Sequence, residues 1–160
     1  MDIFLKASDV FQFAVRIEED GELFYRKAAF IADDKEAGKL FEHLAGEEVI
    51  HKNTFQKMLL GIDEYRPPET FKGEYLAYLK DYIDSKVVFS KKAKDKELPG
   101  VHNTLTAIDF AMQRELDSIL FYQEIKQFVP KKEFGLIDKI IEEERHHFAK
   151  LSDTKKKYQK

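Results

Sequence analysis

The sequence predicts an all-α protein in which four long helices form a bundle with one long crossover connection. Apolar residues recur at spacings of three and four over four long segments, which is the pattern of amphipathic helices. The chain has only 7 glycines and 4 prolines in 160 residues, too few for the many turns of an all-β protein. The two predicted helix pairs also repeat each other in sequence, with a long connection between them.

Residues 8–61 are predicted to form the first helix pair. The apolar pattern covers residues 8–32 and then residues 35–60. Asp34 is suited to cap the second helix, because its carboxylate can accept hydrogen bonds from the N–H groups of the first turn. Gly61 is suited to end that helix. Since only a short turn separates the two helices, we expect them to lie antiparallel.

Residues 62–102 are predicted to form the crossover between helices 2 and 3. The stretch contains one short helix, residues 72–84, and a lysine-rich run, residues 91–96, which we interpret as solvated surface. The second helix pair follows over residues 103–158. A helix of 25 residues is about 37 Å long, and a 41-residue connection can travel that distance. We therefore expect a single domain over residues 1–160.

The composition excludes several classes of function. With 27 basic and 30 acidic side chains the net charge is −3, so the chain lacks the basic surplus typical of nucleic-acid binding proteins. It contains no cysteine, which excludes disulfides, iron–sulfur clusters, thiolate-bound zinc and thiol catalysis. No apolar run is long enough to span a membrane, and no signal peptide is visible. We expect a cytoplasmic protein with no membrane or nucleic-acid partner.

An internal repeat relates the two helix pairs. Residues 13–25 align with residues 110–122 at an offset of 97, and seven of these thirteen positions are identical. An offset of 96 matches a Glu-x-x-His motif in the second helix of each pair. These matches predict a duplicated helix pair within one chain. The repeated polar pairs are Glu18 and Glu115, Tyr25 and Tyr122, Glu48 and Glu144, and His51 and His147.

Six polar residues interrupt the apolar faces of the four predicted helices. Because an unpaired buried carboxylate is very costly, the four glutamates must be protonated, paired or bound to metal, and we find no lysine or arginine on these faces to pair with them. Two divalent cations would balance four carboxylates, with the two imidazoles as neutral ligands. Oxygen and nitrogen ligands favour iron or manganese over copper(I) or structural zinc. The candidate ligands, here called the carboxylate–histidine cluster, are Glu18, Glu48, His51, Glu115, Glu144 and His147.

The fourth helix offers two overlapping Glu-x-x-His motifs. A single such motif is weak evidence, because a shuffled chain of this composition would contain about half a match. Glu144 and His147 fall on the apolar face, and the repeat selects the same pair. Glu143 and His146 lie about 100° further round the helix, toward solvent. We therefore predict that the first pair binds metal and the second does not.

These residues and their spacing resemble the ferritin-like di-iron carboxylate superfamily, and within it the rubrerythrin group. The resemblance rests on Glu18 with Tyr25 seven residues later, on Glu48-Val-Ile-His51, and on their repeat in the second half. It implies a ferritin-like bundle with a carboxylate-bridged di-iron site, in which manganese or zinc could substitute for iron. Rubrerythrins reduce hydrogen peroxide to water, and relatives oxidise ferrous iron with oxygen or peroxide. The resemblance therefore implies an oxidoreductase that uses peroxide or oxygen, and we expect a homodimer.

The chain departs from typical rubrerythrins in two respects. They carry a rubredoxin domain with four cysteines, which this chain lacks, so electrons would have to come from an external donor such as a rubredoxin. They also have an extra carboxylate on the third helix, whereas the positions one turn either side of Glu115 are Met112 and Ser118. The second departure bears on the peroxidase mechanism more than on the metal site.

Smaller features of the repeat suggest supporting roles. Tyr25 and Tyr122 lie two turns beyond the glutamates of the first and third helices, so their hydroxyls are placed to bond ligand carboxylates. A core tyrosine can also simply fill space. Gly21 and Ser118 are small residues one turn past the same glutamates, and we expect them to leave room for the oxidant.

Two other functions remain open at this point. Ferroxidase activity with iron storage would need a hollow shell of many subunits, which sedimentation distinguishes from a dimer. A metal-free structural bundle is the other alternative, and metal analysis of the purified protein would identify it.

Overall fold

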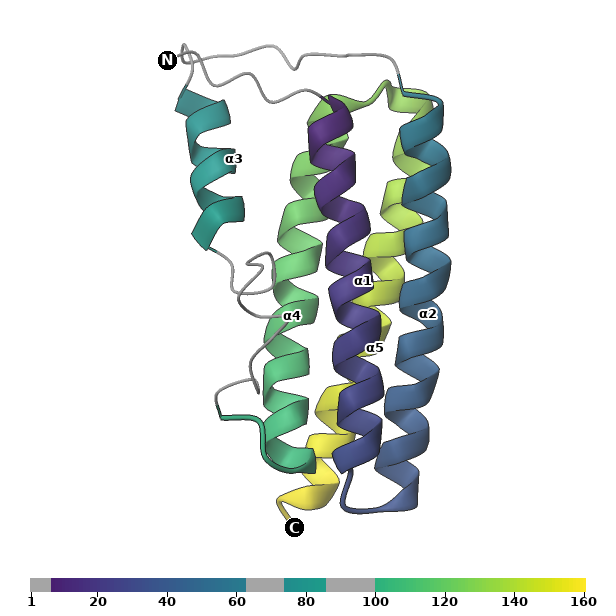
Figure 1. The fold of residues 1–160 in the computed structure, drawn as a ribbon, viewed down its shortest axis with the longest axis vertical. Helices are drawn as coiled ribbons and strands as arrows, with labels where there is room; N and C mark the ends of the chain where they lie inside the picture. Colours follow the sequence, from purple (N-terminus) through teal and green to yellow (C-terminus); the bar gives the residue numbers. More distant parts are fainter. Residues whose placement is uncertain (1–6, 63–73, 86–99) are drawn as a thin grey trace.

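The computed structural model describes residues 7–62, 74–85 and 100–160, and these residues form helices and turns without any strand. Four long helices form a bundle, with a shorter helix beside it (Figure 1). The predicted all-α bundle with one crossover is therefore confirmed. The helices are α1 (Ala7–Ile31), α2 (Lys35–Leu60), α3 (Glu74–Ser85), α4 (Thr104–Ile125) and α5 (Phe134–Tyr158).

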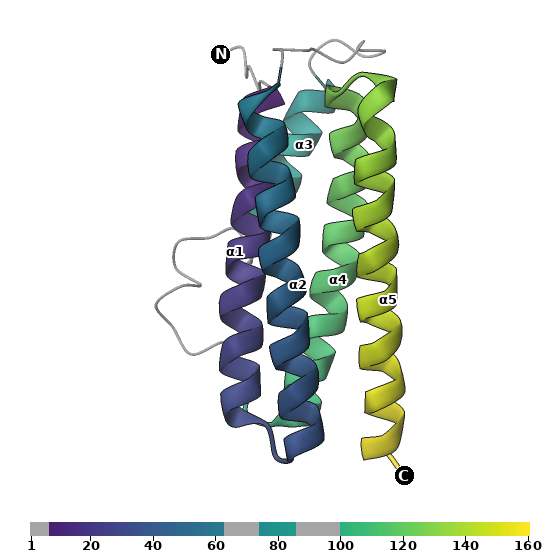
Figure 2. The ribbon, with the colours of Figure 1, turned by 90° about the vertical axis from the view of Figure 1, so that its right-hand side faces the viewer.

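The two helix pairs lie side by side. α1 and α2 are antiparallel and joined by a tight turn, and α4 and α5 form a second antiparallel pair (Figure 2). α2 ends at one end of the bundle and α4 begins at the other, so α2 and α4 run in the same direction. The connection between them therefore joins opposite ends of the bundle.

The short helix of the crossover, α3, lies along the outer side of α4 (Figure 1). The hydroxyl of Tyr82 donates a 2.9 Å hydrogen bond to the backbone carbonyl of Asp117. The Tyr82 ring also stacks on Phe121, with ring centroids 6.4 Å apart. The lysine-rich run at 91–96 lies outside the described residues.

Local signals in the sequence explain where the helices begin and end. Asp34 caps α2 by accepting a 2.9 Å hydrogen bond from the backbone N–H of Ala37, and the N–H of Gly61 closes the other end. Asn103 caps α4 with a full capping box. Between α4 and α5 the chain forms two 3-10 turns on either side of Pro130, which cannot continue a helix.

Two apolar core clusters occupy the two ends of the bundle. Each draws side chains from all four long helices, so each holds the two helix pairs together by burying apolar surface. The residues of the carboxylate–histidine cluster lie between them along every helix. One cluster includes Phe11, Phe55, Phe121, Ile125 and Ile137, and the other includes Tyr25, Phe41, Leu44, Ile108 and Leu151.

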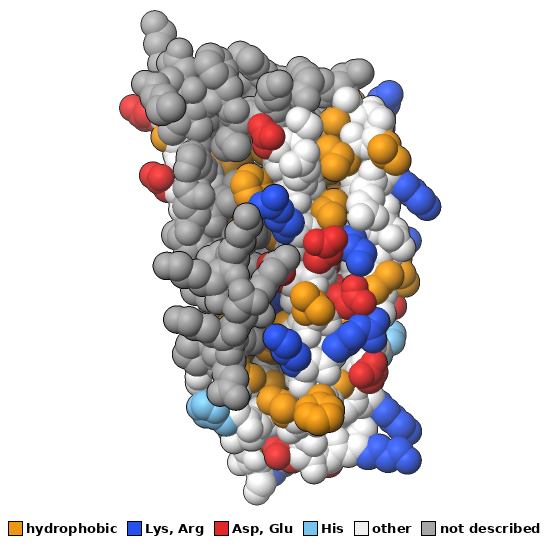
Figure 3. Space-filling model, viewed as in Figure 1, with side chains coloured by type: hydrophobic (Ala, Val, Ile, Leu, Met, Phe, Trp, Pro, Cys, Tyr) orange, Lys and Arg blue, Asp and Glu red, His pale blue; other side chains and the backbone are white. Residues whose placement is uncertain are grey.

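The outer face over α1 and α2 mixes acidic and basic side chains (Figure 3). Glu22 forms ion pairs with Arg26 at 2.9 Å and with Lys52 at 3.2 Å. Ion pairs at the protein surface each contribute little to stability. Among the described residues, none of the helices is long and apolar enough to cross a membrane.

Candidate metal centre

The structure brings together all six residues of the carboxylate–histidine cluster. They lie at mid-height in the bundle, and none is more than 2% exposed. Each long helix contributes because its inward face carries a polar residue in the same register as the apolar ones. The contributions are Glu18 from α1, Glu48 and His51 from α2, Glu115 from α4, and Glu144 and His147 from α5.

The donor atoms of the cluster fall into two groups of four. Within each group the atoms lie within 4.8 Å of one another, close enough to surround one cation. Each group offers three carboxylates and one imidazole. Because two glutamates belong to both groups, their carboxylates could bridge two neighbouring cations. The groups are Glu18, Glu48, His51 and Glu144, and Glu48, Glu115, Glu144 and His147.

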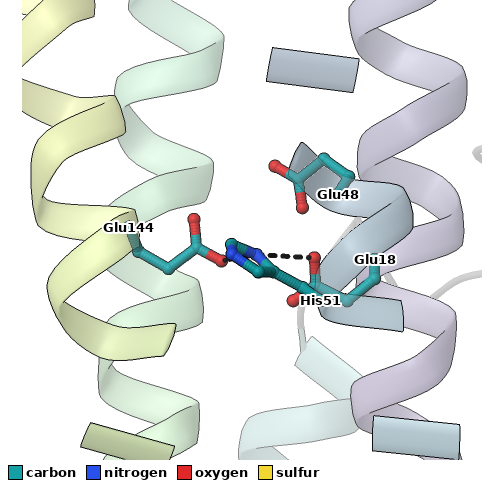
Figure 4. Close-up of side chains that lie close together, drawn as sticks. All are labelled: Glu18, Glu48, His51 and Glu144. Carbon is teal, nitrogen blue, oxygen red and sulfur yellow. Dashed lines mark ion pairs between the residues drawn. The ribbon is translucent and has the colours of Figure 1, made fainter. Parts of the chain in front are cut away.

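In the first group, His51 lies between two carboxylates from different helices (Figure 4). Its Nδ1 is 3.0 Å from Glu144 Oε1 and 3.5 Å from Glu18 Oε2. Among the described residues, His51 Nδ1 and Glu18 Oε2 are nevertheless buried without a hydrogen-bond partner. Buried polar atoms normally have partners, and a cation between these atoms would satisfy both. The donor set therefore fits a metal ion.

The second group has the same construction. His147 Nδ1 lies 2.9 Å from Glu144 Oε2 and 3.8 Å from Glu115 Oε2. The imidazole rings of His51 and His147 stack with centroids 5.6 Å apart and planes 21° apart. Both histidines thus present Nδ1 to the centre, in agreement with the repeat.

The overlapping motif on α5 has a different role. His146 is 67% exposed and, like Glu143, belongs to neither donor group. Glu143, however, places its Oε2 2.9 Å from Nε2 of His51. A carboxylate on the outer nitrogen of an imidazole fixes the ring with its other nitrogen toward the metal position. Helical phase alone predicts that Glu143 is not a ligand, and it does not reveal this contact.

The two tyrosines bond to the glutamates across the repeat. The Tyr25 hydroxyl donates to Glu115 Oε1, and the Tyr122 hydroxyl donates to Glu18 Oε1. The expected contact between tyrosine hydroxyls and these carboxylates is confirmed. Each bond runs between α1 and α4, so each tyrosine holds a glutamate of the other half of the chain.

The sequence pattern reveals no basic residue that pairs with these glutamates, but the structure buries one arginine beside them. Arg114 immediately precedes Glu115 and is only 3% exposed. Its Nη2 donates a 3.2 Å hydrogen bond to the backbone carbonyl of Ile17 on α1. Burial disfavours the guanidinium, but the charges of Glu48 and Glu115 among others outweigh it, and the pKa of Arg114 lies above its ordinary value.

The same side chain overturns the role expected for Gly21. A Cβ atom on this glycine would lie 2.5 Å from Arg114 Nη2 and 2.9 Å from Nη1. The guanidinium therefore fills the space that we expected the oxidant to use. It also lies over two aromatic rings, 5.9 Å from the centroid of Phe24 and 5.7 Å from that of Tyr25.

The histidines hold protons in this environment. Burial disfavours the imidazolium of His51, but the carboxylates of Glu144 and Glu18 beside it outweigh burial and raise its pKa to about 11. Burial is outweighed in the same way at His147, where Glu115 and Glu144 raise the pKa to about 9. Without metal, protons therefore supply positive charge that cations could replace.

The carboxylates respond unequally to their surroundings. Burial and repulsion from Glu18 and Glu144 raise the pKa of Glu48 well above its ordinary value. Burial and repulsion from Glu144 also raise the pKa of Glu115, to about 8, against the opposing hydrogen bond to His147. At Glu144 the two histidines beside it outweigh burial and lower the pKa. The raised pKa values of Glu48 and Glu115 show that the neighbouring protein groups do not fully balance four ionised carboxylates.

A four-helix bundle with one long crossover, and with glutamates and two Glu-x-x-His motifs at its centre, is the architecture of the ferritin-like di-iron carboxylate proteins. Within that class, the rubrerythrin family model matches residues 9–155, and the chain belongs to the rubrerythrin family.

A solved structure supports the same assignment. The chain is similar to a protein of Thermotoga maritima described as a ferritin-like diiron-carboxylate protein, with 28% sequence identity and a TM-score of 0.66. The similarity covers 95% of each chain. No curated protein sequence matches the chain.

Proposed function

We propose that the protein binds two iron ions in the carboxylate–histidine cluster and acts as an oxidoreductase that reduces hydrogen peroxide. The observation that carries the proposal is the pair of buried donor groups that share Glu48 and Glu144. Two adjacent sites with common carboxylates suit two ions that act together. The oxygen and nitrogen donors favour iron or manganese, and the family favours iron.

The chemistry requires two electrons and two protons for each peroxide. Two bound ferrous ions would supply one electron each, which with two protons reduce one hydrogen peroxide to two waters. The residues of the two donor groups would hold the ions, and Glu48 and Glu144 belong to both groups. We assign Glu18 and His51 to one ion, and Glu115 and His147 to the other.

The two tyrosines would orient the carboxylates rather than exchange protons. Burial and the neighbouring Glu115 raise the pKa of Tyr25 well above its ordinary value, and burial with Glu18 does the same for Tyr122. Both hydroxyls therefore remain neutral donors. The apolar clusters on either side limit the access of water to the centre.

These 160 residues contain no cysteine with which to hold a rubredoxin iron. We propose an external donor such as a rubredoxin. We also propose a homodimer rather than a hollow shell, which sedimentation velocity would distinguish. A shell of many subunits would favour iron storage instead.

Reconstitution and rapid kinetics test the proposal. Protein loaded anaerobically with ferrous iron should hold about two ions per chain, and manganese or zinc should compete for the same places. Stopped-flow mixing should show rapid oxidation by hydrogen peroxide in a single turnover, and sustained turnover should require an added donor and its reductase. A Glu48→Gln, Glu144→Gln double variant is the control, since it removes both shared carboxylates.

Each alternative predicts a different result. Much faster oxidation by oxygen than by peroxide at equal concentration would replace the peroxidase function with an oxidase or ferroxidase function. Typical relatives carry a further carboxylate on this helix, whereas the positions one turn either side of Glu115 are Met112 and Ser118. The rates with the two oxidants must therefore be compared. A metal content near zero in folded protein would instead identify a structural bundle.

A further inference from the structure

We propose that Arg114 supplies a fixed positive charge beside the metal centre and thereby favours its reduced state. This inference rests on the proposed function, because it concerns two iron ions in the carboxylate–histidine cluster. It adds a residue that lies outside both donor groups and outside the Glu-x-x-His motifs.

The guanidinium is held in one place. Its Nη2 donates a hydrogen bond to the carbonyl of Ile17, and its Cζ lies over the rings of Phe24 and Tyr25. The group also fills the space next to Gly21. With only 3% of the residue exposed, the charge cannot move out into water. Arginine also stays protonated at every pH at which the protein is folded.

No carboxylate neutralises this charge directly. Among the described residues, Nε and Nη1 of Arg114 are buried and have no hydrogen-bond partner, and no ion pair to the guanidinium is formed. A buried arginine normally pairs with a carboxylate. Arg114 is instead adjacent to Glu115 in the chain, and its charge acts on the carboxylates of the cluster through space.

Packing alone does not require a cation here. In the internal repeat, Arg114 aligns with Ile17, which is 2% exposed. The equivalent place in the other half is thus filled by an apolar side chain. The pairing of Arg114 with Gly21 occurs once, because the repeat places Ser118 where the first half has glycine. The arginine is therefore a local addition to one side of the centre.

The charge balance sets the direction of the effect. Two ferrous ions and four carboxylates sum to zero, and Arg114 adds one positive charge. When a ferrous ion gives one electron to an acceptor, the centre gains a further positive charge. Like charges repel strongly in a buried, poorly polarisable environment. Arg114 therefore makes oxidation less favourable and raises the midpoint potential of the centre.

Anaerobic redox titration of the iron-loaded protein tests the inference. Arg114→Gln removes the charge but retains a donor for the Ile17 carbonyl, and Arg114→Lys retains the charge. At a fixed solution potential, Arg114→Gln should raise the ratio of oxidised to reduced iron roughly tenfold, which is a fall of about 59 mV for a one-electron step. Arg114→Lys should stay close to the wild-type protein. The titration is followed by absorbance with redox mediators, so the readout does not depend on turnover.

Metal content separates this inference from the proposed function. If Arg114→Gln holds two irons and its potential equals that of the wild type, the inference is wrong, although the metal site stands. If the wild-type protein itself binds no iron, the proposed function fails first. Should Arg114→Gln not fold, Gly21→Ala tests the same point, because its Cβ displaces the guanidinium without removing the charge. Because the position of the charge changes, the potential should change, and an unchanged potential would overturn the inference.

Discussion

The hydroxyl of Tyr122 on α4 donates a hydrogen bond to Glu18 on α1, a residue of the other half of the internal repeat. Tyr25 makes the reciprocal bond to Glu115. Each carboxylate is therefore held from two sides, by its own helix and by the helix opposite. Partners of this kind orient metal ligands and raise their affinity for the ion.

Tyr122→Phe should weaken metal binding without unfolding the bundle. The ring still fills its place in the core, while Glu18 loses the hydrogen bond from the Tyr122 hydroxyl. Loss of such a partner typically costs 10–100-fold in affinity, and we expect roughly tenfold here. Competition with a chromophoric chelator measures it. Tyr158→Phe, at the exposed end of α5, is the matched control and should bind like the wild type.

Mutation should distinguish the two overlapping Glu-x-x-His motifs of α5. His147→Ala removes a donor from the second group and should lose much of the bound iron. His146→Ala changes an exposed side chain that belongs to neither group and should keep metal content near the wild-type value. Metal analysis of both purified variants decides. The reverse result would mean that the register of α5 is wrong by one residue.

Glu143→Ala should weaken one metal position more than the other. Its carboxylate contacts Nε2 of His51, a donor of the first group only. A ferrous titration of the variant should therefore show one tight and one weakened site, with the weaker reduced by roughly tenfold. Glu142→Ala removes a carboxylate that is 55% exposed, and serves as the control. Two equally weakened sites would contradict the assignment of His51 to one ion.

The metal-free protein should lose stability as the pH rises from about 6.5 to 9. The pKa of His147 rises from 6.5 to about 9 on folding, so the folded state holds a proton that the unfolded state releases. Its contribution is complete below pH 6.5 and is lost as the pH passes 9. The raised pKa of Glu115, about 8, acts in the same direction.

Urea unfolding at a series of pH values measures this loss. A pKa shift of this size corresponds to roughly 3 kcal/mol at most. His147→Ala should flatten the pH dependence, and saturating metal should reverse it, because cations replace the protons. A metal-free protein whose stability rises between these pH values would contradict the protonated state of the cluster.

The sequence predicts the fold and the central cluster because both leave periodic signals. The recurrence of apolar residues identifies the buried face of each helix, and Glu48 and Glu144 interrupt that face at equivalent places of the repeat. The offset between the halves then chooses His147 over His146 without any structural information.

Arg114 could not be placed in the same way, although a signal for it exists. It continues the spacing of three and four through Ala111 and Ser118, so it sits within a second buried row of α4. Whether a guanidinium fits there depends on Gly21 of another helix. A pattern along one helix does not state which residue faces it across an interface. The contact between Glu143 and His51 was missed for the same reason.

The reciprocal tyrosine bonds also bear on the ancestry of such a chain. The tyrosine and the glutamate of each helix pair bond to residues of the other pair. A second copy of one helix pair, related to the first by a twofold axis, would provide the same partners. In such a symmetric dimer of helix pairs, a change at the place of Ile17 would necessarily occur twice, giving two arginines or none. Fusion of the two copies into one polypeptide removes this constraint. Ile17 and Arg114 illustrate such a one-sided change, because these equivalent buried positions hold an apolar residue in one half of the chain and a cation in the other.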